Sequence, residues 1–538
     1  MVAAPMSCSY RPLGEYRNLL RYMFVGAGGI LAAWTWIDPT WFLAAWLGLF
    51  MLVSAIHGAP PKLAFRRAFC FGLAGLMVAF HWCPAVIADN LNLTRVTAWM
   101  LFLVLAGWDA LQFGVFGYLV AKAQSRRFPL ALTYPMVWVA VELVWPHVFP
   151  WRLGHSQVAW KPLIQVADLS GAYGISFALV WGAAAAAVLL NTMVLPRRQI
   201  VLRAGPIAIE ALVCGLTLLA AIGYGHWRID QLEQSFPLQP SLRVAIVQPG
   251  VSSSKQMEKC RALSQELRDP VDLICWPESS VGTYSLRLNA FRPPEDLQKL
   301  SRFSRDPPRP LPEPNAYLLC AGRTYADDTP PQGPYYVTAF LVDKQERIIG
   351  RYYKRGLMPF GEYVPGQQWF PRLIDLFEMT IHFRSGMKAS SLRLPNDFQL
   401  GVLICYEDLD EKYARDSVLA GAQVLCSLNN TSLFGRTAAV PQHQQLGLLR
   451  AVENRRYLLR CGTNGITSVI SPTGRVAAQA KAHSEATLIA TVYSSKTRSI
   501  YTRYGNVFGY GCLGITAIVL YIAARDRKTR RIDSAKTE

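Results

Sequence analysis

Three residue types that together could perform acyl transfer each lie at or just after the end of a predicted strand. Glu278 comes just after VDLICW, Lys354 follows GRYY, and Cys405 ends GVLIC. A cysteine near neutral pH is mostly a thiol, so it needs a base or a nearby cation to become a nucleophile. The Glu278 carboxylate could take that proton, and the Lys354 ammonium could stabilise an oxyanion. The set therefore suits acyl transfer through a thioester.

Two alternatives remain open from the residues themselves. Cys405 could be a small apolar side chain at the end of a core strand, since free cysteines are commonly buried. A Cys–His pair could instead use His443, which lies in the helix-compatible segment PQHQQLGLLRAVENRR.

The reactive residues lie in a stretch whose pattern predicts an α/β domain. Short apolar segments typical of strands alternate with polar, helix-compatible segments such as 254–267 and 440–456. In such sheets, strands commonly present reactive side chains at their C-terminal ends. The expected strands are 242–248, 271–276, 316–320, 338–342, 401–405 and 423–428.

The rest of the chain reads as membrane-spanning. The composition is 51% hydrophobic with 15 Trp, and the apolar residues concentrate before and after the α/β segment. We expect a bundle over residues 1–224, a catalytic domain over 225–506, a last span over 507–524 and a basic tail over 525–538. The eight expected spans are 19–37, 41–56, 68–87, 96–120, 129–148, 175–194, 207–224 and 507–524.

Basic residues follow alternate apolar runs, as orientation signals do. The three short loops on the other side hold only Arg95, Arg152 and Lys161. The pattern therefore predicts both termini in the cytoplasm and the catalytic domain outside it, in the periplasm of a bacterium with two membranes. The basic residues on the cytoplasmic side, before the tail, are Arg11, Arg17, Arg21, Lys62, Arg66, Arg67, Lys122, Arg126, Arg127, Arg197, Arg198 and Arg203.

Three carboxylates inside the apolar runs and one of two expected loops each allow more than one role. Asp109, Glu142 and Glu210 fall inside apolar runs, where they could line a polar headgroup cavity or bond neighbouring helices. Residues 285–314 read as a surface loop. Residues 360–391 include Phe370, Leu376, Phe377, Ile381 and Phe383, which could admit a lipid chain or simply pack on the domain.

The charge and cysteine patterns make some functions improbable. The formal charge is +19, but no basic stripe interleaves with aromatic residues, so we do not expect nucleic-acid binding. The 11 cysteines show no CxxC spacing, so we expect no metal site. The six cysteines within 225–506 could pair in an oxidising compartment, and the mechanism requires Cys405 to stay free.

Ordered motifs carry a resemblance to a known family. WPE, YYKRGLMPFGEYVP and CYED resemble, in this order, the carbon–nitrogen hydrolase (nitrilase) superfamily. With a membrane bundle before this domain and one helix after it, nearly the whole chain resembles the apolipoprotein N-acyltransferase family. The resemblance implies an α-β-β-α sandwich and no cofactor.

The resemblance also implies residue roles. Glu278 matches the general base, Lys354 the oxyanion-stabilising lysine and Cys405 the nucleophile. Glu362 matches a second carboxylate that supports the lysine, and Tyr406 and Glu407 match the pair after the nucleophile, where Glu407 is expected to be structural.

The sequence departs from the family after the strand that follows the nucleophile. Where the family has Asn-Asp-x-Trp-Phe-Gly, this chain has Asn-Thr-Ser-Leu-Phe-Gly. We expect Leu433, Phe434 and Gly435 to contact substrate. Replacing Trp by Leu433 removes aromatic area and an N–H donor, so acyl-chain or acceptor preference could differ.

The implied reaction passes an acyl chain from a membrane phospholipid, through a Cys405 thioester, to the α-amino group of the diacylglyceryl-cysteine of an apolipoprotein. One rival is a membrane-tethered amidase that passes the acyl group to water. Another is a non-catalytic lipid-binding protein, which the intact Glu278, Lys354 and Cys405 argue against.

Overall fold

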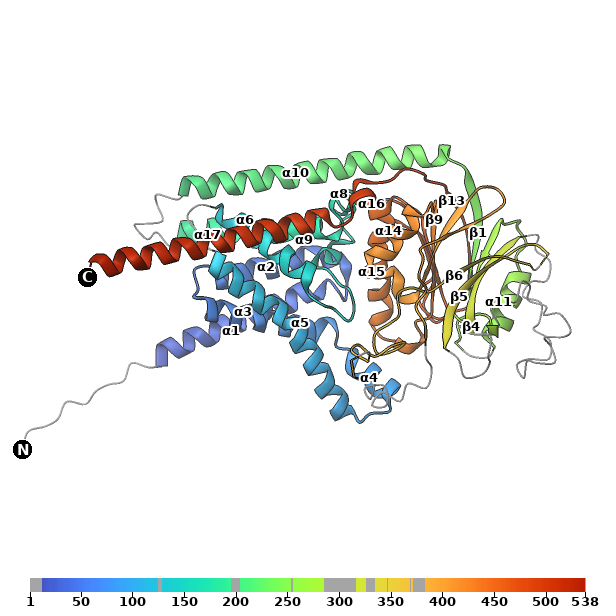
Figure 1. Cartoon of the computed structure of the whole chain (residues 1–538), viewed down its shortest axis with the longest axis horizontal. Helices are drawn as coiled ribbons and strands as arrows, with labels where there is room; N and C mark the ends of the chain where they lie inside the picture. Colours follow the sequence, from blue (N-terminus) through green and yellow to red (C-terminus); the bar gives the residue numbers. More distant parts are fainter. Residues whose placement is uncertain are drawn as a thin grey trace, which may run out of the picture.

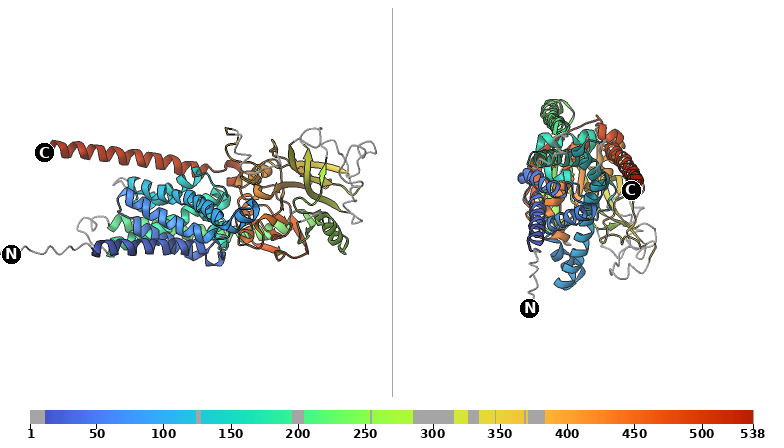
Figure 2. Two further views of the ribbon diagram at one scale, coloured as in Figure 1. Left: turned by 90° about the horizontal axis from the view of Figure 1, so that it is seen from below. Right: turned by 90° about the vertical axis from the view of Figure 1, so that its left-hand side faces the viewer.

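The computed structural model consists of a helical bundle joined to an α/β domain (Figure 1). It describes residues 12–123, 128–194, 204–252, 255–284, 316–325, 334–345, 347–367, 369–370 and 383–537. Helix α1 begins, and helix α17 ends, at the end of the bundle away from the sheets (Figures 1 and 2).

Each of the eight apolar segments forms a helix of the bundle. Five described helices are long and apolar enough to cross a membrane, or six if α3 and α4, which meet at a 62° bend, count as one span. The span count is therefore lower than eight by this measure, because α1 and α6 do not meet it. The helices are α1 (Pro12–Trp34), α2 (Phe42–Ile56), α3 (Pro61–Ala79), α4 (Cys83–Leu91), α5 (Arg95–Ala123), α6 (Leu130–Val144), α9 (Ala172–Val194), α10 (Ala204–Ser235) and α17 (Val507–Thr537).

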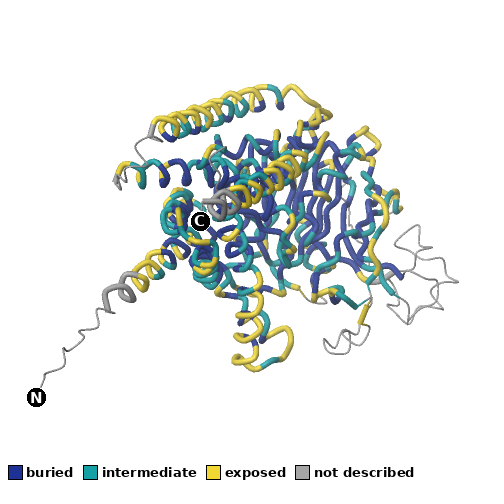
Figure 3. Tube along the Cα trace, turned by 60° about the vertical axis from the view of Figure 1, so that its left-hand side comes forward, coloured by how far each residue is buried: buried dark blue, intermediate teal, exposed yellow. Residues whose placement is uncertain are grey.

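The outer faces of the bundle are apolar and exposed. Figure 3 shows long exposed tracts on α10 and α17, and exposed side chains there include Leu212, Leu219 and Ile518. Contiguous apolar surface of this extent is typical of contact with lipid. The helix expected to end at Tyr224 continues to Ser235, beyond the apolar run.

The carboxylates inside the apolar runs mostly bond neighbouring backbone. Glu142 accepts a hydrogen bond from the Leu153 amide at 2.6 Å, and Glu210 accepts one from the Leu132 amide at 2.5 Å. Asp109 accepts a hydrogen bond from Trp151 at 3.3 Å and also borders an apolar cavity. Glu142 and Glu210 therefore serve helix packing.

The α/β domain contains two sheets. In the first, the strand order is β13–β1–β2–β4–β5–β6, with β3 beside β4. In the second, it is β12–β11–β10–β9–β8–β7. The strands are β1 (Ser241–Gln248), β2 (Leu273–Cys275), β3 (Thr283–Tyr284), β4 (Tyr317–Tyr325), β5 (Tyr335–Val342), β6 (Ile348–Tyr353), β7 (Ser391–Arg393), β8 (Gln399–Ile404), β9 (Val424–Asn429), β10 (Leu458–Gly462), β11 (Ser468–Ile470), β12 (Val476–Gln479) and β13 (Ala486–Tyr493).

The alternation of side chains along the strands explains the layers. In β1, Val244 and Ile246 join the core between the sheets, whereas Ala245 and Val247 face a second core beneath helix α11 (Gln256–Gln265). In β8, Val402 and Ile404 face the first sheet, and Leu403 faces helices α14 (Glu411–Leu419) and α15 (Ala439–Asn454). Strands buried on both faces read as unbroken apolar runs. This is the expected α-β-β-α sandwich.

The α14–α15 layer seats the domain on the bundle (Figure 1). Gln442 of α15 donates to the carbonyls of Trp36 and Ala79, where α1 and α3 end, and accepts from Trp82 at 2.9 Å. Gln445 donates to the carbonyls of Thr35 and His155. Amide side chains thus satisfy the carbonyls of Thr35, Trp36 and Ala79, which lie at or just beyond the ends of helices.

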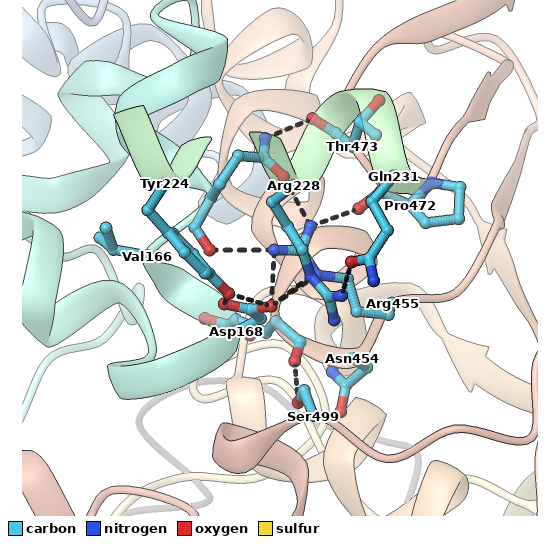
Figure 4. A network of polar contacts seen from close by, with 12 residues as sticks. Val166, Asp168, Tyr224, Arg228, Gln231, Asn454, Arg455, Pro472, Thr473 and Ser499 are labelled. Carbon is cyan, nitrogen blue, oxygen red and sulfur yellow. Dashed lines mark hydrogen bonds and ion pairs between the residues drawn. The ribbon is translucent and has the colours of Figure 1, made fainter. Parts of the chain in front are cut away.

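A second junction lies at the C-terminal end of α15 (Figure 4). Arg455, in a left-handed conformation at φ 53°, places Nη2 2.8 Å and Nε 3.0 Å from Asp168 of α8 (Ala167–Ser170). Arg228 and Tyr224 of α10 also bond Asp168. One buried carboxylate therefore joins three elements.

The structure confirms the six expected strands and both expected helices within a few residues. The six expected strands did not include β3, β6, β7 or β10–β13. Residues 285–314, and Leu376, Phe377 and Ile381 of the second expected loop, lie outside the described residues. Of that loop's other members, Phe370 is exposed and Phe383 forms a bridge with Tyr335.

Candidate active site

Cys405 lies at a sharp turn that ends β8. Its φ of 52° is left-handed, and the 3-10 helix Cys405–Asp408 follows directly. A non-glycine residue held in this region costs roughly 1–3 kcal/mol, and such strain is common at active sites. The first amides of the helix have no acceptor within it, which leaves donors beside the thiol. The turn presents Cys405 at the sheet edge.

Glu278, Lys354 and Glu362 converge on this thiol. Lys354 Nζ lies 3.5 Å from Glu278 Oε1 and 2.7 Å from Glu362 Oε1. The Cys405 thiol donates to the Asn430 carbonyl oxygen, 3.8 Å from Sγ, and its interaction with Glu278 lowers the pKa of that carboxyl, against the larger effect of burial. Glu278 is 7% exposed, Lys354 1% and Cys405 9%, so the three groups interact away from bulk water. The structure brings together the residues that the sequence suggested.

Burial controls the protonation states in this cluster. It raises the pKa of Glu278 above its ordinary value, although the Lys354 ammonium opposes the rise. Burial and the Glu278 carboxylate raise the pKa of Cys405. For Lys354, burial alone would lower the pKa, but Glu278 and Glu362 raise it. At neutral pH the resting site holds a thiol and an ammonium, so the thiol needs a base during reaction.

Glu407 ties the lysine loop to the nucleophile turn. Its Oε1 accepts from the amides of Arg355 at 2.7 Å and Gly356 at 3.0 Å, and from Tyr352 Oη at 2.8 Å. Its Oε2 accepts from the Ile404 amide at 2.7 Å. Glu407 therefore fixes the backbone on both sides of the site. Glu362 Oε2 likewise accepts from the Met358 amide at 2.8 Å.

Backbone contacts hold Glu278 in place. The Gln256 side chain donates to the Glu278 carbonyl at 2.9 Å, and Thr463 Oγ1 lies 3.4 Å from that oxygen. The sequence did not single out Gln256, Thr463, Tyr352 or the Asn430 carbonyl as site residues. Two of these residues had a signal, because Tyr352 begins the motif YYKRGLMPFGEYVP and Asn430 begins the segment that departs from the family.

Tyr406 connects the nucleophile turn to the bundle. Its hydroxyl donates to the Val148 carbonyl at 2.7 Å, in the chain between α6 and the 3-10 helix Leu153–Gln157. The residue after the thiol thus contacts the bundle directly.

Phe434 makes an aromatic contact with the bundle from the 3-10 helix Ser432–Phe434. Its ring centroid lies 5.7 Å from that of Trp82 and 6.2 Å from that of Phe149. Leu433 is 39% exposed, and its carbonyl accepts from Asn90 of α4 at 3.1 Å. Gly435, at φ 55°, has open space where a side chain would lie.

An apolar cavity adjoins this aromatic cluster. It is small, about 60 Å³, and its lining includes Leu76, Trp82, Phe102, Val148 and Phe149. On the domain side, Trp369 and Phe370 are 73% and 66% exposed. Apolar surface therefore flanks the loop of Glu362 and the segment after β9.

His443 does not contact Cys405 in the described structure. Its Nδ1 lies 2.5 Å from Arg460 Nη2 and 3.8 Å from Asp408 Oδ1. Burial lowers the pKa of His443 to about 4. The Cys–His alternative is therefore wrong, because the His443 imidazole lies in a buried cluster with Arg460 and Asp408 and does not contact Cys405.

No metal or disulfide chemistry is evident in the described residues. They contain no group of three or more His, Cys, Asp or Glu side chains able to hold a metal ion. The six domain cysteines, residues 260, 275, 320, 405, 426 and 461, are free thiols.

Comparisons with known proteins identify the family of this chain. Residues 243–502 match the carbon-nitrogen hydrolase model, and residues 28–185 match the apolipoprotein N-acyltransferase N-terminal domain. A Geobacter metallireducens protein named apolipoprotein N-acyltransferase is 29% identical over 523 residues, covering 94% of this chain and 95% of that protein. The chain belongs to the apolipoprotein N-acyltransferase family.

Two further proteins are similar to this chain. The apolipoprotein N-acyltransferase of Azotobacter vinelandii is 29% identical over 515 residues, covering 91% of this chain and 92% of that protein. The crystal structure of Saccharomyces cerevisiae Nit3, a member of branch 10 of the nitrilase superfamily, is similar at TM-score 0.34 and 20% identity, covering 47% of this chain and 90% of that one. The chain is a membrane enzyme of the apolipoprotein N-acyltransferase family.

Proposed function

We propose that this protein transfers a fatty acyl chain from a membrane phospholipid, through a Cys405 thioester, to the α-amino group of the N-terminal diacylglyceryl-cysteine of apolipoproteins. The observation that carries the proposal is the buried Glu278–Lys354–Cys405 cluster on a domain seated against an apolar bundle.

In the first half-reaction, Glu278 takes the proton of the Cys405 thiol as sulfur attacks the ester carbonyl. Lys354 Nζ, aided by an amide of the 3-10 helix Cys405–Asp408, stabilises the oxyanion. The intermediate collapses to a thioester, and Glu278 returns its proton to the departing lysophospholipid oxygen.

In the second half-reaction, the free amine of the lipoprotein cysteine attacks the thioester carbonyl. Glu278 takes the proton from the amine nitrogen, an amide bond forms, and the Cys405 sulfur leaves and is reprotonated. No metal or nucleotide takes part in either half-reaction.

Apolar surface beside the site supports a lipid donor. Trp369 and Phe370 are exposed next to the Glu362 loop, and Phe434 packs on Trp82 and Phe149 of the bundle. A soluble amide or nitrile would leave this surface in water, whereas a lipid chain would cover it. We propose that Leu433 and Gly435 border the path of the acyl chain.

We also propose that both termini lie in the cytoplasm, beneath a bacterial inner membrane, and that the catalytic domain lies in the periplasm. The basic residues beside alternate apolar runs support this orientation. The start of α1 and the end of α17 both lie away from the sheets, which is consistent with this arrangement.

The test is acyl transfer in detergent with labelled phosphatidylethanolamine and a diacylglyceryl lipopeptide. We expect labelled amide with the unchanged protein and with Cys260→Ala, a buried cysteine outside the site, but none with Cys405→Ala. Label found only as free fatty acid would favour a hydrolase. Transfer by Cys405→Ala would contradict the mechanism.

A further inference from the structure

The bundle carries an open groove at the end opposite the catalytic domain, which we name the distal groove. It lies between α3 and α5 and is lined by Lys62, Phe65, Arg66, Val115 and Tyr118. Its volume is about 410 Å³, within the roughly 300–1,000 Å³ typical of small-molecule sites. Its wall is mainly apolar, and its polar groups are basic.

Close packing of the two helices forms the floor of the groove. Gly117 lies where a Cβ would come within 2.6 Å of the Ala64 carbonyl oxygen, and Phe65 lies across Gly114 at similarly short range. Small residues let helix backbones approach closely. The Phe65 ring consequently rests on α5 and forms part of the apolar wall.

Cations gather at one end of this wall. Lys62 and Arg66 are exposed one turn apart on α3, and among the residues that the structure describes neither has a carboxylate at ion-pair distance. Lys122, at the end of α5, places Nζ 5.6 Å from the ring centroid of Tyr118. Arg527 of α17 donates to the Lys122 carbonyl at 2.6 Å, which adds a further positive charge.

We propose that the distal groove binds an anionic glycerophospholipid. Its phosphate would pair with Lys62 and Arg66, and one acyl chain would lie along Phe65, Val115 and Tyr118. A free phosphate ion would leave the apolar wall unused, and a zwitterionic lipid would gain less from uncompensated cations. A lipid with net negative charge would both pair with the two cations and cover the apolar wall.

The distal groove is separate from the acyl-transfer site. Ala79, at the other end of α3, bonds Gln442 of the catalytic domain, whereas Lys62 lies in the first turn. The 19 residues of α3 span roughly 28 Å at 1.5 Å per residue. In the proposed orientation, this lipid belongs to the cytoplasmic leaflet, so the groove would anchor the enzyme rather than supply its acyl donor.

The test is native mass spectrometry of the full-length protein in detergent with phosphatidylglycerol or phosphatidylcholine of the same chain length. We expect one phosphatidylglycerol to be retained in preference to phosphatidylcholine. Lys62→Gln/Arg66→Gln should weaken this retention by roughly tenfold or more, since each basic residue contributes about 1 kcal/mol to anionic-lipid binding.

The matched control is Arg21→Gln/Lys528→Gln, which removes the same charges from exposed positions that do not line the groove. It should leave retention unchanged. Val115→Phe, which fills the groove and keeps its cations, should lower retention of the lipid. Equal losses in both double variants, or full retention by Lys62→Gln/Arg66→Gln or by Val115→Phe, would overturn the proposal.

Discussion

At the residue scale, the reaction depends on how the proton leaves the Cys405 thiol. Burial raises the pKa of Cys405 and also that of Glu278, so the resting pair is a thiol beside a carboxylate of increased basicity. A raised carboxyl pKa makes Glu278 a better proton acceptor near neutral pH.

The rate of thioester formation should therefore rise with pH as Glu278 loses its proton. Because the pKa of Glu278 is raised, the rise should be centred above the ordinary value of 4.5. Single-turnover rates from labelled phospholipid across pH 4–10 would measure it, and Glu278→Gln should lower them roughly 10²–10⁴-fold. A rise centred at or above 9.0, the ordinary pKa of a thiol, would show that Cys405 ionises without a base.

Glu407 is a positioning residue whose loss should loosen the site. Glu407→Gln places an amide donor against several donors, including the amides of Ile404 and Arg355. An unsatisfied buried donor costs about 1–3 kcal/mol, so we expect a slower first half-reaction and a lower unfolding temperature. Glu485→Gln, which alters an exposed ion pair with Lys259, is the control. Wild-type rates and stability in Glu407→Gln would disprove this role.

At the element scale, two junctions hold the catalytic domain on the bundle. The α15 glutamines bond the ends of α1 and α3, and Asp168 joins α8, α10 and the end of α15 (Figure 4). The second junction is a buried cluster of charges. Loss of the Asp168 carboxylate would leave the buried Arg455, and Arg228 beside it, without a compensating charge.

Asp168→Asn should therefore destabilise the protein by about 3–5 kcal/mol, because Arg455 and Arg228 would lose their shared carboxylate. Thermal unfolding in detergent would measure the change. Asp269→Asn, which breaks the exposed pair with Arg243, should cost about 0–1 kcal/mol. Equal midpoints for the two variants would contradict a structural role for the junction.

The sequence predicted the elements better than their contacts. Buried parallel strands such as β8 and β9 are unbroken apolar runs, so their positions could be read directly. Strands β10–β13 carry polar residues such as Arg460, whose burial depends on Asp408 across the fold. The order Glu278, Lys354, Cys405 indicated the site, but the bond from Tyr406 to Val148 joins residues that no local pattern relates.

At the scale of the whole molecule, we propose that the catalytic domain and the chain termini lie on opposite sides of a membrane. The charge pattern predicts this orientation, and the position of the helix ends away from the sheets is consistent with it. The apolar flank of the site would then meet the outer leaflet.

Fusions to the full-length C-terminus would test the orientation. Alkaline phosphatase needs disulfides, which form in an oxidising compartment, so a fusion after Glu538 should be inactive in cells. A cytoplasmically folding fluorescent protein at the same position should fluoresce. An active phosphatase fusion would reverse the proposed topology.

The central claim is that Cys405 carries the acyl chain between two lipid substrates. Intact-mass measurement after incubation with phosphatidylethanolamine alone should show one acyl adduct, and peptide mapping should place it on Cys405. Adding diacylglyceryl lipopeptide should remove the adduct and produce an equal amount of acylated amine in a single turnover. An adduct on another residue, or an adduct that survives the lipopeptide while acylated product forms, would contradict the account.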